Sequence, residues 1–172
     1  MAENTDIGEI TQAVEDKLLA KIIIDEVVID VSQIIWAVDE FPPHVKGNYD
    51  IVLRPSLEQN VMPVDDGGGR QALRCSQILD IFVRTSSGLA VLGNDKVRIL
   101  KQVAVERAVL DALAGKMLAN ASGLDLLTMP LKWRNTSAAS KDKQVAAKNL
   151  WERSGLSFEV HYRPLIDPSD YT

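Results

Sequence analysis

The fold is decided near the end of the chain, by the stretch Leu156-Ser157-Phe158-Glu159-Val160-His161-Tyr162-Arg163. Apolar and polar side chains alternate through it without interruption. Because successive side chains of a β-strand point to opposite faces of the sheet, the alternation predicts a strand with one buried face and one face exposed to water. The chain must then supply an apolar layer that covers the buried face.

A second, longer strand is predicted over Arg70 to Thr85, where apolar and polar residues again alternate. Its apolar face carries Leu73, Cys75, Leu79, Ile81 and Val83, interrupted by Gln77, and its polar face carries Arg74, Ser76, Asp80 and Arg84. Shorter strands are predicted over Ser32 to Val38, Tyr49 to Arg54 and Leu126 to Trp133. The last is assigned to a sheet edge, because Pro130 has no N–H to donate to a neighbouring strand.

Two helices are predicted from apolar residues at spacings of three and four. The first runs from about Gly8 to Ala20 and the second from about Lys96 to Ala119. Their predicted buried stripes are Ile7, Ile10, Val14, Leu18 and Ile22 for the first, and Ile99, Val103, Leu110, Leu113 and Met117 for the second. Residues 22–31 are rich in β-branched side chains and fit either a helix end or a strand.

Together these elements predict an α+β fold, a mostly antiparallel sheet with two helices packed on one face. The 172 residues suit a single domain spanning 1–172, with its core between about residues 7 and 166. Two stretches break the pattern and are predicted to be extended loop or arm segments. They are 55–69, which holds two prolines and three consecutive glycines and also fits a long hairpin tip, and the polar stretch 135–150.

Charge is unevenly distributed along the chain. The sequence has 19 basic and 24 acidic residues, a net charge of −5 that argues against general nucleic-acid binding. Residues 1–50 hold eleven acidic and three basic residues, whereas residues 132–153 hold six basic and two acidic ones. Oppositely charged regions suit head-to-tail packing of identical copies or docking onto a different ring. The plainer alternative is a solvated acidic helix and a solvated basic loop.

The basic region supplies the candidate partner interface. The residues assigned to it are Lys132, Arg134, Lys141, Lys143, Lys148 and Trp151. Trp151 is predicted to be either an interface anchor or a core residue. Trp36 and Trp133 lie in apolar strand patterns and are predicted to be buried.

Reactive motifs are nearly absent from the sequence. Three acidic pairs are present, Asp25-Glu26, Asp39-Glu40 and Asp65-Asp66. Only a pair in a loop, such as Asp65-Asp66, can direct both carboxylates at one ion, and no third ligand follows it at EF-hand spacing. The glycines after it lack the Gly-Lys-Ser/Thr ending of a phosphate-binding P-loop. We therefore predict a protein that is not an enzyme, without catalytic residues, metal or cofactor.

Certain stretches resemble the tail terminator and neck proteins of tailed bacteriophages. Ile34-Ile35-Trp36 before Glu40-Phe41-Pro42-Pro43, followed by Tyr49 to Pro55, is similar to that family's first two strands. The Arg70 to Thr85 strand, followed by Asn94-Asp95 and a long alanine-rich helix, is similar to its centre. Gly155 to Arg163 is similar to the strand that ends many such subunits. The resemblance covers most of residues 7–166.

The resemblance implies a structural virion protein that forms a ring, usually a homohexamer, at the head–tail junction. Such a ring terminates the tail tube and joins the tail to the head. The implied partners are further copies of the chain, the tail tube protein and the connector or adaptor proteins of the neck. Neither a membrane nor sequence-specific nucleic acid is implied, and the implied location is the virion neck, assembled in the host cytoplasm.

Three alternatives stay open on the sequence. Within virion proteins, the chain fits a head-completion adaptor on a connector of twelvefold symmetry. A small soluble enzyme would place its site around Asp65-Asp66, Asp80 and His161. A monomeric binding module would use the basic region 132–153 against an acidic partner or nucleic acid.

Overall fold

The computed structural model describes residues 2–21, 23–24, 27–28, 33–38, 40–42, 45–47, 49–65, 71–85, 96–141 and 152–165. Two helices are present in this part of the chain, α1 (Ile7–Lys21) and α2 (Lys96–Leu113). The strands are β1 (Asn4–Thr5), β2 (Ile23–Ile24), β3 (Val27–Val28), β4 (Ile34–Trp36), β5 (Tyr49–Pro55), β6 (Asn60–Asp65), β7 (Gln71–Thr85), β8 (Lys132–Lys141) and β9 (Glu152–Pro164).

The sheet is built around two long antiparallel strands, β7 and β9, which pair from Cys75 opposite Tyr162 to Thr85 opposite Glu152. The other edge of β7 is shared end to end by β5 and β6. The other edge of β9 is shared by β8 and β1. With its 15 residues, β7 extends over about 50 Å, so the seven-stranded sheet is long and narrow.

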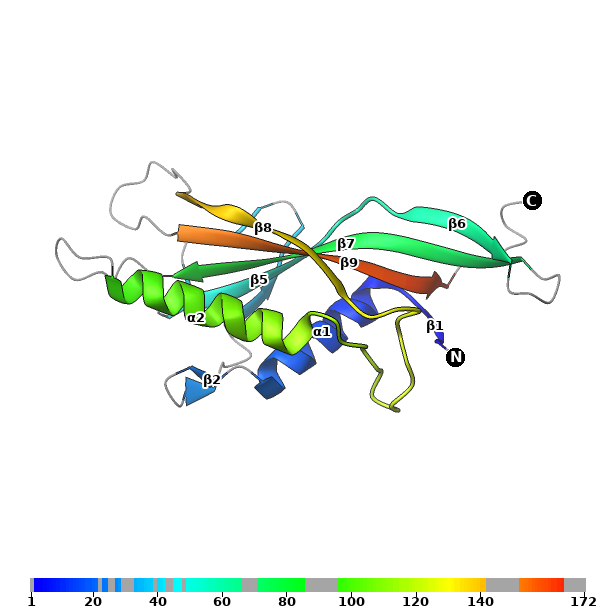
Figure 1. The fold of residues 1–172 in the computed structure, drawn as a ribbon, viewed down its shortest axis with the longest axis horizontal. Coiled ribbons are helices and arrows are strands. Elements are labelled where there is room, and N and C mark those ends of the chain that lie inside the picture. Colours follow the sequence, from blue (N-terminus) through cyan, green and yellow to red (C-terminus); the bar gives the residue numbers. More distant parts are fainter. Residues whose placement is uncertain are drawn as a thin grey trace.

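Both helices lie in one layer along the same side of the sheet (Figure 1). We call the face that they cover the inner face and the opposite one the outer face. Only β1 and β4 run parallel to the strands they pair with, β9 and β5, in this seven-stranded sheet. The predicted α+β class, a mostly antiparallel sheet with two helices on one face, is confirmed.

The core lies between the helices and the inner face. Its fully buried residues include Ile10, Val14 and Leu18 of α1, Val105, Val109 and Leu113 of α2, Ile51 and Leu53 of β5, Leu79, Ile81 and Val83 of β7, and Leu156, Phe158, Val160 and Tyr162 of β9. The alternation in the two long strands therefore predicted their buried faces correctly. The first helix is also confirmed to within a residue at each end.

The second helix ends at Leu113, six residues before the predicted end at Ala119. Gly115 follows with φ +70°, a left-handed conformation that commonly terminates a helix. Its N–H donates to the Leu131 carbonyl oxygen at 2.9 Å, so the backbone is turned toward another part of the chain. The glycine that the pattern places inside the helix is the residue that ends it.

The buried stripe of α2 also differs from the predicted one. The structure buries Arg98, Gln102, Val105, Val109, Ala112 and Leu113, of which only Leu113 was predicted. Ile99 and Val103 are 50% and 45% exposed. The helix is apolar on two sides. The side that faces the sheet carries Gln102, whose amide donates to the Val83 carbonyl oxygen at 2.9 Å.

The strand predicted over Leu126 to Trp133 holds only for Lys132 and Trp133, which begin the edge strand β8, and the prediction that 135–141 belongs to an arm is wrong. The described part of this region forms β8, which pairs with β9 and has irregularities after Trp133 and after Ser137. Leu126 is buried without being in a strand. β8 can form from a polar sequence because an edge strand leaves many of its side chains exposed to water. Residues 142–150 lie outside the described residues.

Both tryptophans predicted to be buried are half exposed, Trp36 to 43% and Trp133 to 46%. Each lies on an edge strand, where the sheet has no further strand to cover it. Within the open stretch 22–31, the described residues are strands, because β2 and β3 pair as a separate antiparallel ribbon. The strand predicted over Ser32 to Val38 shortens to β4, and β6 occupies much of the predicted loop 55–69.

Candidate interaction surfaces

The predicted interface residues lie on or beyond β8. Lys132 is exposed at its start. Arg134 is also exposed, and its Nε lies 2.8 Å from Oε2 of Glu159 on the neighbouring β9. Lys141 ends β8, but the structure does not describe its side chain; Lys143, Lys148 and Trp151 lie outside the described residues. The structure thus places two of the six side chains, on an edge strand rather than on a free arm.

Glu159 also contacts His161, two residues further along β9 on the outer face. Its Oε1 lies 2.8 Å from the His161 Nε2. The carboxylate is therefore held between a guanidinium and an imidazole. These contacts hold the Glu159 carboxylate in place on the outer face of the sheet.

A second polar cluster on the outer face is centred on Asp80 of β7. The Ser157 hydroxyl donates to its Oδ1 at 2.6 Å, and the Arg54 guanidinium donates to its Oδ2 at 3.1 Å. The same guanidinium stacks on Phe82, with 4.8 Å between its central carbon and the ring centroid, and lies 5.7 Å from the ring of Phe41. Both oxygens of Asp80 are thus occupied by neighbours that hold it in place.

The enzyme hypothesis needs Asp80 and His161 close together, and the register separates them. His161 pairs with Ser76, whereas Asp80 pairs with Ser157. The offset is four residues, which corresponds to about 13 Å along a strand. Asp66 lies outside the described residues, and nothing is described of the Asp65 side chain. In the part of the chain that the structure describes, no three His, Cys, Asp or Glu side chains gather as metal ligands.

One end of the outer face is closed by a buried ion pair that the sequence reasoning missed. Arg84 donates to both oxygens of Asp50, at 2.6 Å each, and to the Pro42 carbonyl oxygen at 2.7 Å. The backbone N–H of Lys46 donates to Asp50 at 3.0 Å. Arg84 is 1% exposed and Asp50 is 0% exposed. Pro42 and Lys46 therefore lie over this end of the sheet. The available signal in the sequence was a charged residue, Asp50, inside the apolar run of β5.

The inner face carries a polar group at its other end. The Tyr162 hydroxyl donates to Oε1 of Gln77 at 2.7 Å and accepts from Nε2 of Gln59 at 3.3 Å. Burial raises the pKa of this hydroxyl above its usual range, and burial likewise raises the pKa of the Cys75 thiol. Both groups are therefore neutral at physiological pH. Cys75 is fully buried, as its place on the apolar face of the strand predicted.

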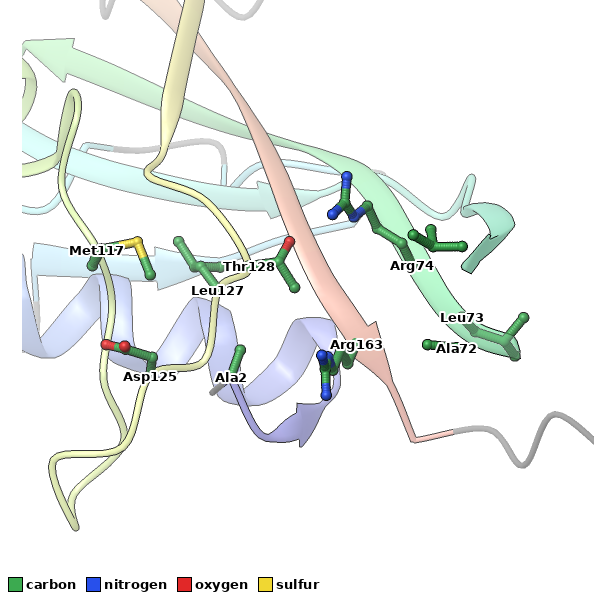
Figure 2. A pocket seen from close by; sticks show the side chains of 10 residues that line it. Ala2, Ala72, Leu73, Arg74, Met117, Asp125, Leu127, Thr128 and Arg163 are labelled. Atoms are coloured by element: carbon green, nitrogen blue, oxygen red, sulfur yellow. The ribbon is translucent and has the colours of Figure 1, made fainter. Parts of the chain in front are cut away.

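A groove of about 460 Å³ lies where the β6–β7 hairpin extends beyond the helices. Figure 2 shows its two walls, the strand carrying Ala72, Leu73 and Arg74 on one side and the segment carrying Met117, Asp125 and Leu127 on the other. Arg163, at the end of β9, lies between them. Its lining combines apolar side chains with Arg74, Asp125 and Arg163, and no motif in the sequence predicted it.

No protein-family model matches the chain, and no curated protein sequence matches it either. Among solved structures, a chain from the virion of a native gene transfer agent (GTA) particle is similar to it, with a TM-score of 0.58 and 19% sequence identity. The alignment covers 91% of this chain and 96% of that chain. At this level of identity the likeness establishes a shared fold.

None of the helices in the described part of the chain is long and apolar enough to span a membrane.

Proposed function

We propose that the chain is a structural protein of a phage-like virion. The observation that carries this proposal is the likeness to a gene transfer agent virion chain, which extends over nearly the full length of both chains. Because one fold can serve several functions, the surfaces of this chain must also suit the role. On the outer face, Asp80 and Glu159 are each held by ion pairs and hydrogen bonds, which is compatible with a structural role.

The finer part of the proposal is a ring at the head–tail junction that terminates the tail tube and joins it to the head. It is supported by the resemblance in the sequence and by the uneven distribution of charge. In this role the partners are other copies of the chain, as a homohexamer, together with the tail tube protein and the neck connector. The second candidate, a head-completion adaptor, differs in the expected twelvefold symmetry.

Particle composition and morphology test the two levels of the proposal separately. Mass spectrometry of purified particles from the producing cell should detect the chain as a stoichiometric component. Cells that lack the chain should release tails of irregular or excessive length, without heads attached, if it is a terminator. Tails of normal length beside unattached heads would favour the adaptor. Complete particles of normal infectivity or transfer activity, made without the chain, would contradict both roles.

A further inference from the structure

The groove of about 460 Å³ opens where the two central strands of the sheet separate. β7 and β9 pair as far as Cys75 opposite Tyr162, and in the described chain their ladder goes no further. The same register would next place Arg74 opposite Arg163, two like charges, and would then reach Pro164, which has no N–H to donate. Both arginines therefore lie where the strands part, and both line the groove.

The separation leaves a short stretch of strand edge open beside the groove. One edge of β7 pairs with β6 as far as Gln71. On its other edge, the lining residues Ala72 to Arg74 have no ladder partner among the described residues. Figure 1 shows β9 ending before the β6–β7 hairpin does. Unpaired backbone N–H and C=O groups of this kind form a template on which a further extended segment can pair.

The two groove arginines have no acidic partner in the part of the chain that the structure describes. Each is half-buried, and neither side chain forms an ion pair or a hydrogen bond with a described residue. In Figure 2, Arg74 extends from β7 toward β9, and the carboxylate of Asp125 points away from Arg163. Three arginines of β5, β7 and β8 do pair with carboxylates, namely Arg54, Arg84 and Arg134. The groove thus holds two cations that are available to a bound anion.

The rest of the lining favours the carboxylate of a peptide over a phosphate. Leu73, Met117 and Leu127 lie in the same groove and suit apolar residues on either side of an acidic one. Asp125 also lines the groove and repels a polyanion. The net charge of −5 opposes nucleic acid. An extended peptide with acidic and apolar residues matches the arginines, the apolar side chains and the open strand edge together.

We propose that the groove binds an extended acidic segment of a partner protein. The segment pairs with the open edge at Ala72 to Arg74 and places a carboxylate against Arg74 and Arg163, whose planar guanidinium groups match it. The described strands of a second copy suit the groove less well. Among the strands with an open outer edge, β4 has no charged residue, β8 has only basic ones, and β6 has a single acid at its last position.

Peptide titration of the full chain tests the site. The probe is a fluorescent peptide in which glutamate alternates with valine, and the matched control has glutamine in place of each glutamate. The wild type should bind the glutamate peptide about tenfold more tightly in fluorescence anisotropy, because charge-assisted hydrogen bonds are the stronger ones. Equal binding of the two peptides, or no binding at about 1 mM peptide, would overturn the proposal.

Methylation of the peptide's backbone nitrogens tests the strand pairing. The methylated glutamate peptide should bind about tenfold more weakly than the unmodified one, because it cannot donate to an open strand edge. Undiminished binding of the methylated peptide would overturn this part of the proposal.

Arg74→Gln and Arg163→Gln test the groove itself, with Arg107→Gln as the matched control. Arg107 is exposed on α2 and does not line the groove. Each groove variant should bind the glutamate peptide about tenfold more weakly than the wild type does. Circular dichroism melting temperatures should not fall, since neither groove arginine loses a partner. Wild-type affinity in both groove variants, or an equal loss in Arg107→Gln, would overturn the site.

Three further measurements distinguish a partner segment from other occupants. Inorganic phosphate that displaces the peptide at a lower concentration than free glutamate does would indicate a phosphate site. A wild-type oligomer that Arg163→Gln dissociates in native mass spectrometry would indicate a second copy. Tighter peptide binding by Asp167→Asn/Asp170→Asn would indicate that the chain's own residues 166–172 compete. Each of these results would overturn the proposed occupant. None depends on particle composition, so the titration leaves the virion role to its own test.

Discussion

Arg84 and Asp50 face each other directly across β7 and β5, and their side chains form an ion pair with two hydrogen bonds of 2.6 Å inside the protein. A buried pair of this kind contributes little by itself, because removing two charges from water costs about as much as their attraction returns. Loss of one partner is different, since the other charge is then left buried and uncompensated.

Asp50→Ala should therefore destabilise the protein by about 3–5 kcal/mol, measured as the free energy of unfolding in a urea titration. The matched control is Arg54→Met, which removes the partly exposed ion pair with Asp80 and should cost about 1 kcal/mol or less. The double variant Asp50→Ala/Arg84→Met should regain much of the loss, because no charge is left unpaired. A single variant as stable as the wild type would mean that water reaches Arg84.

Val160→Asp should unfold the protein or lower its melting temperature strongly. Val160 is fully buried on the inner face of β9, opposite the neutral Gln77 and among the apolar residues of the core, so a carboxylate there would be buried without a cation to pair with. Met62→Asp serves as control, because Met62 is 44% exposed on β6. Thermal denaturation followed by circular dichroism gives the answer, and equal melting temperatures for Val160→Asp and wild type would reverse the assignment of faces in β9.

Alkaline pH should destabilise the fold through Tyr162. Burial raises the pKa of its hydroxyl in the folded state above the usual value of 10.0. Above about pH 10 the unfolded chain therefore releases this proton while the folded chain retains it, and stability falls as the pH rises. Tyr162→Phe should reduce this slope when urea midpoints are compared between neutral and strongly alkaline pH. An unchanged slope would show that Tyr162 ionises as readily folded as unfolded. Burial also raises the pKa values of Tyr49 and Cys75, so some slope should remain.

Gly115→Ala should cost about 1 kcal/mol of stability. The φ of +70° at this position is strained for a residue with a Cβ, and the added methyl would meet no other atom within 4 Å. The cost is thus one of backbone conformation alone. Gly115→Asn should cost less, because asparagine tolerates the left-handed region better. Equal losses for the two variants in urea denaturation would argue against this explanation.

The alternating strands and the first helix could be predicted because their signals are local. In β9, Leu156, Phe158 and Val160 alternate with polar residues, and this alternation shows which face of the sheet each side chain lies on. The α2 stripe was not predictable in the same way, because two sides of that helix are apolar. Packing against the sheet, including the hydrogen bond from Gln102 to Val83, decides which side is buried. The sequence pattern also cannot tell an edge strand from a central one, which is why Trp36 and Trp133 were wrongly assigned to the core.

The candidate surfaces were less predictable than the fold. Lys132 and Arg134 were assigned to a partner interface, which stays a prediction, and the ion pair of Arg134 with Glu159 depends on the register of β8 against β9, which no local pattern encodes. The same holds for Arg84 and Asp50, which are 34 positions apart in the chain. The available signal for this ion pair was the presence of opposite charges in two predicted strands that could lie side by side.

The sharing of one edge of β7 by two successive partners has a mechanical consequence. β5 ends opposite Leu79 and β6 begins opposite Ser76, so β7 is flanked at Gln77 by β9 and by a joint between strands. The Gln77 side chain bridges that joint by donating to the Ser56 carbonyl oxygen and accepting from Tyr162. At this position only β7 and β9 run on without interruption, so a load applied to the projecting hairpin should bend the sheet most easily there.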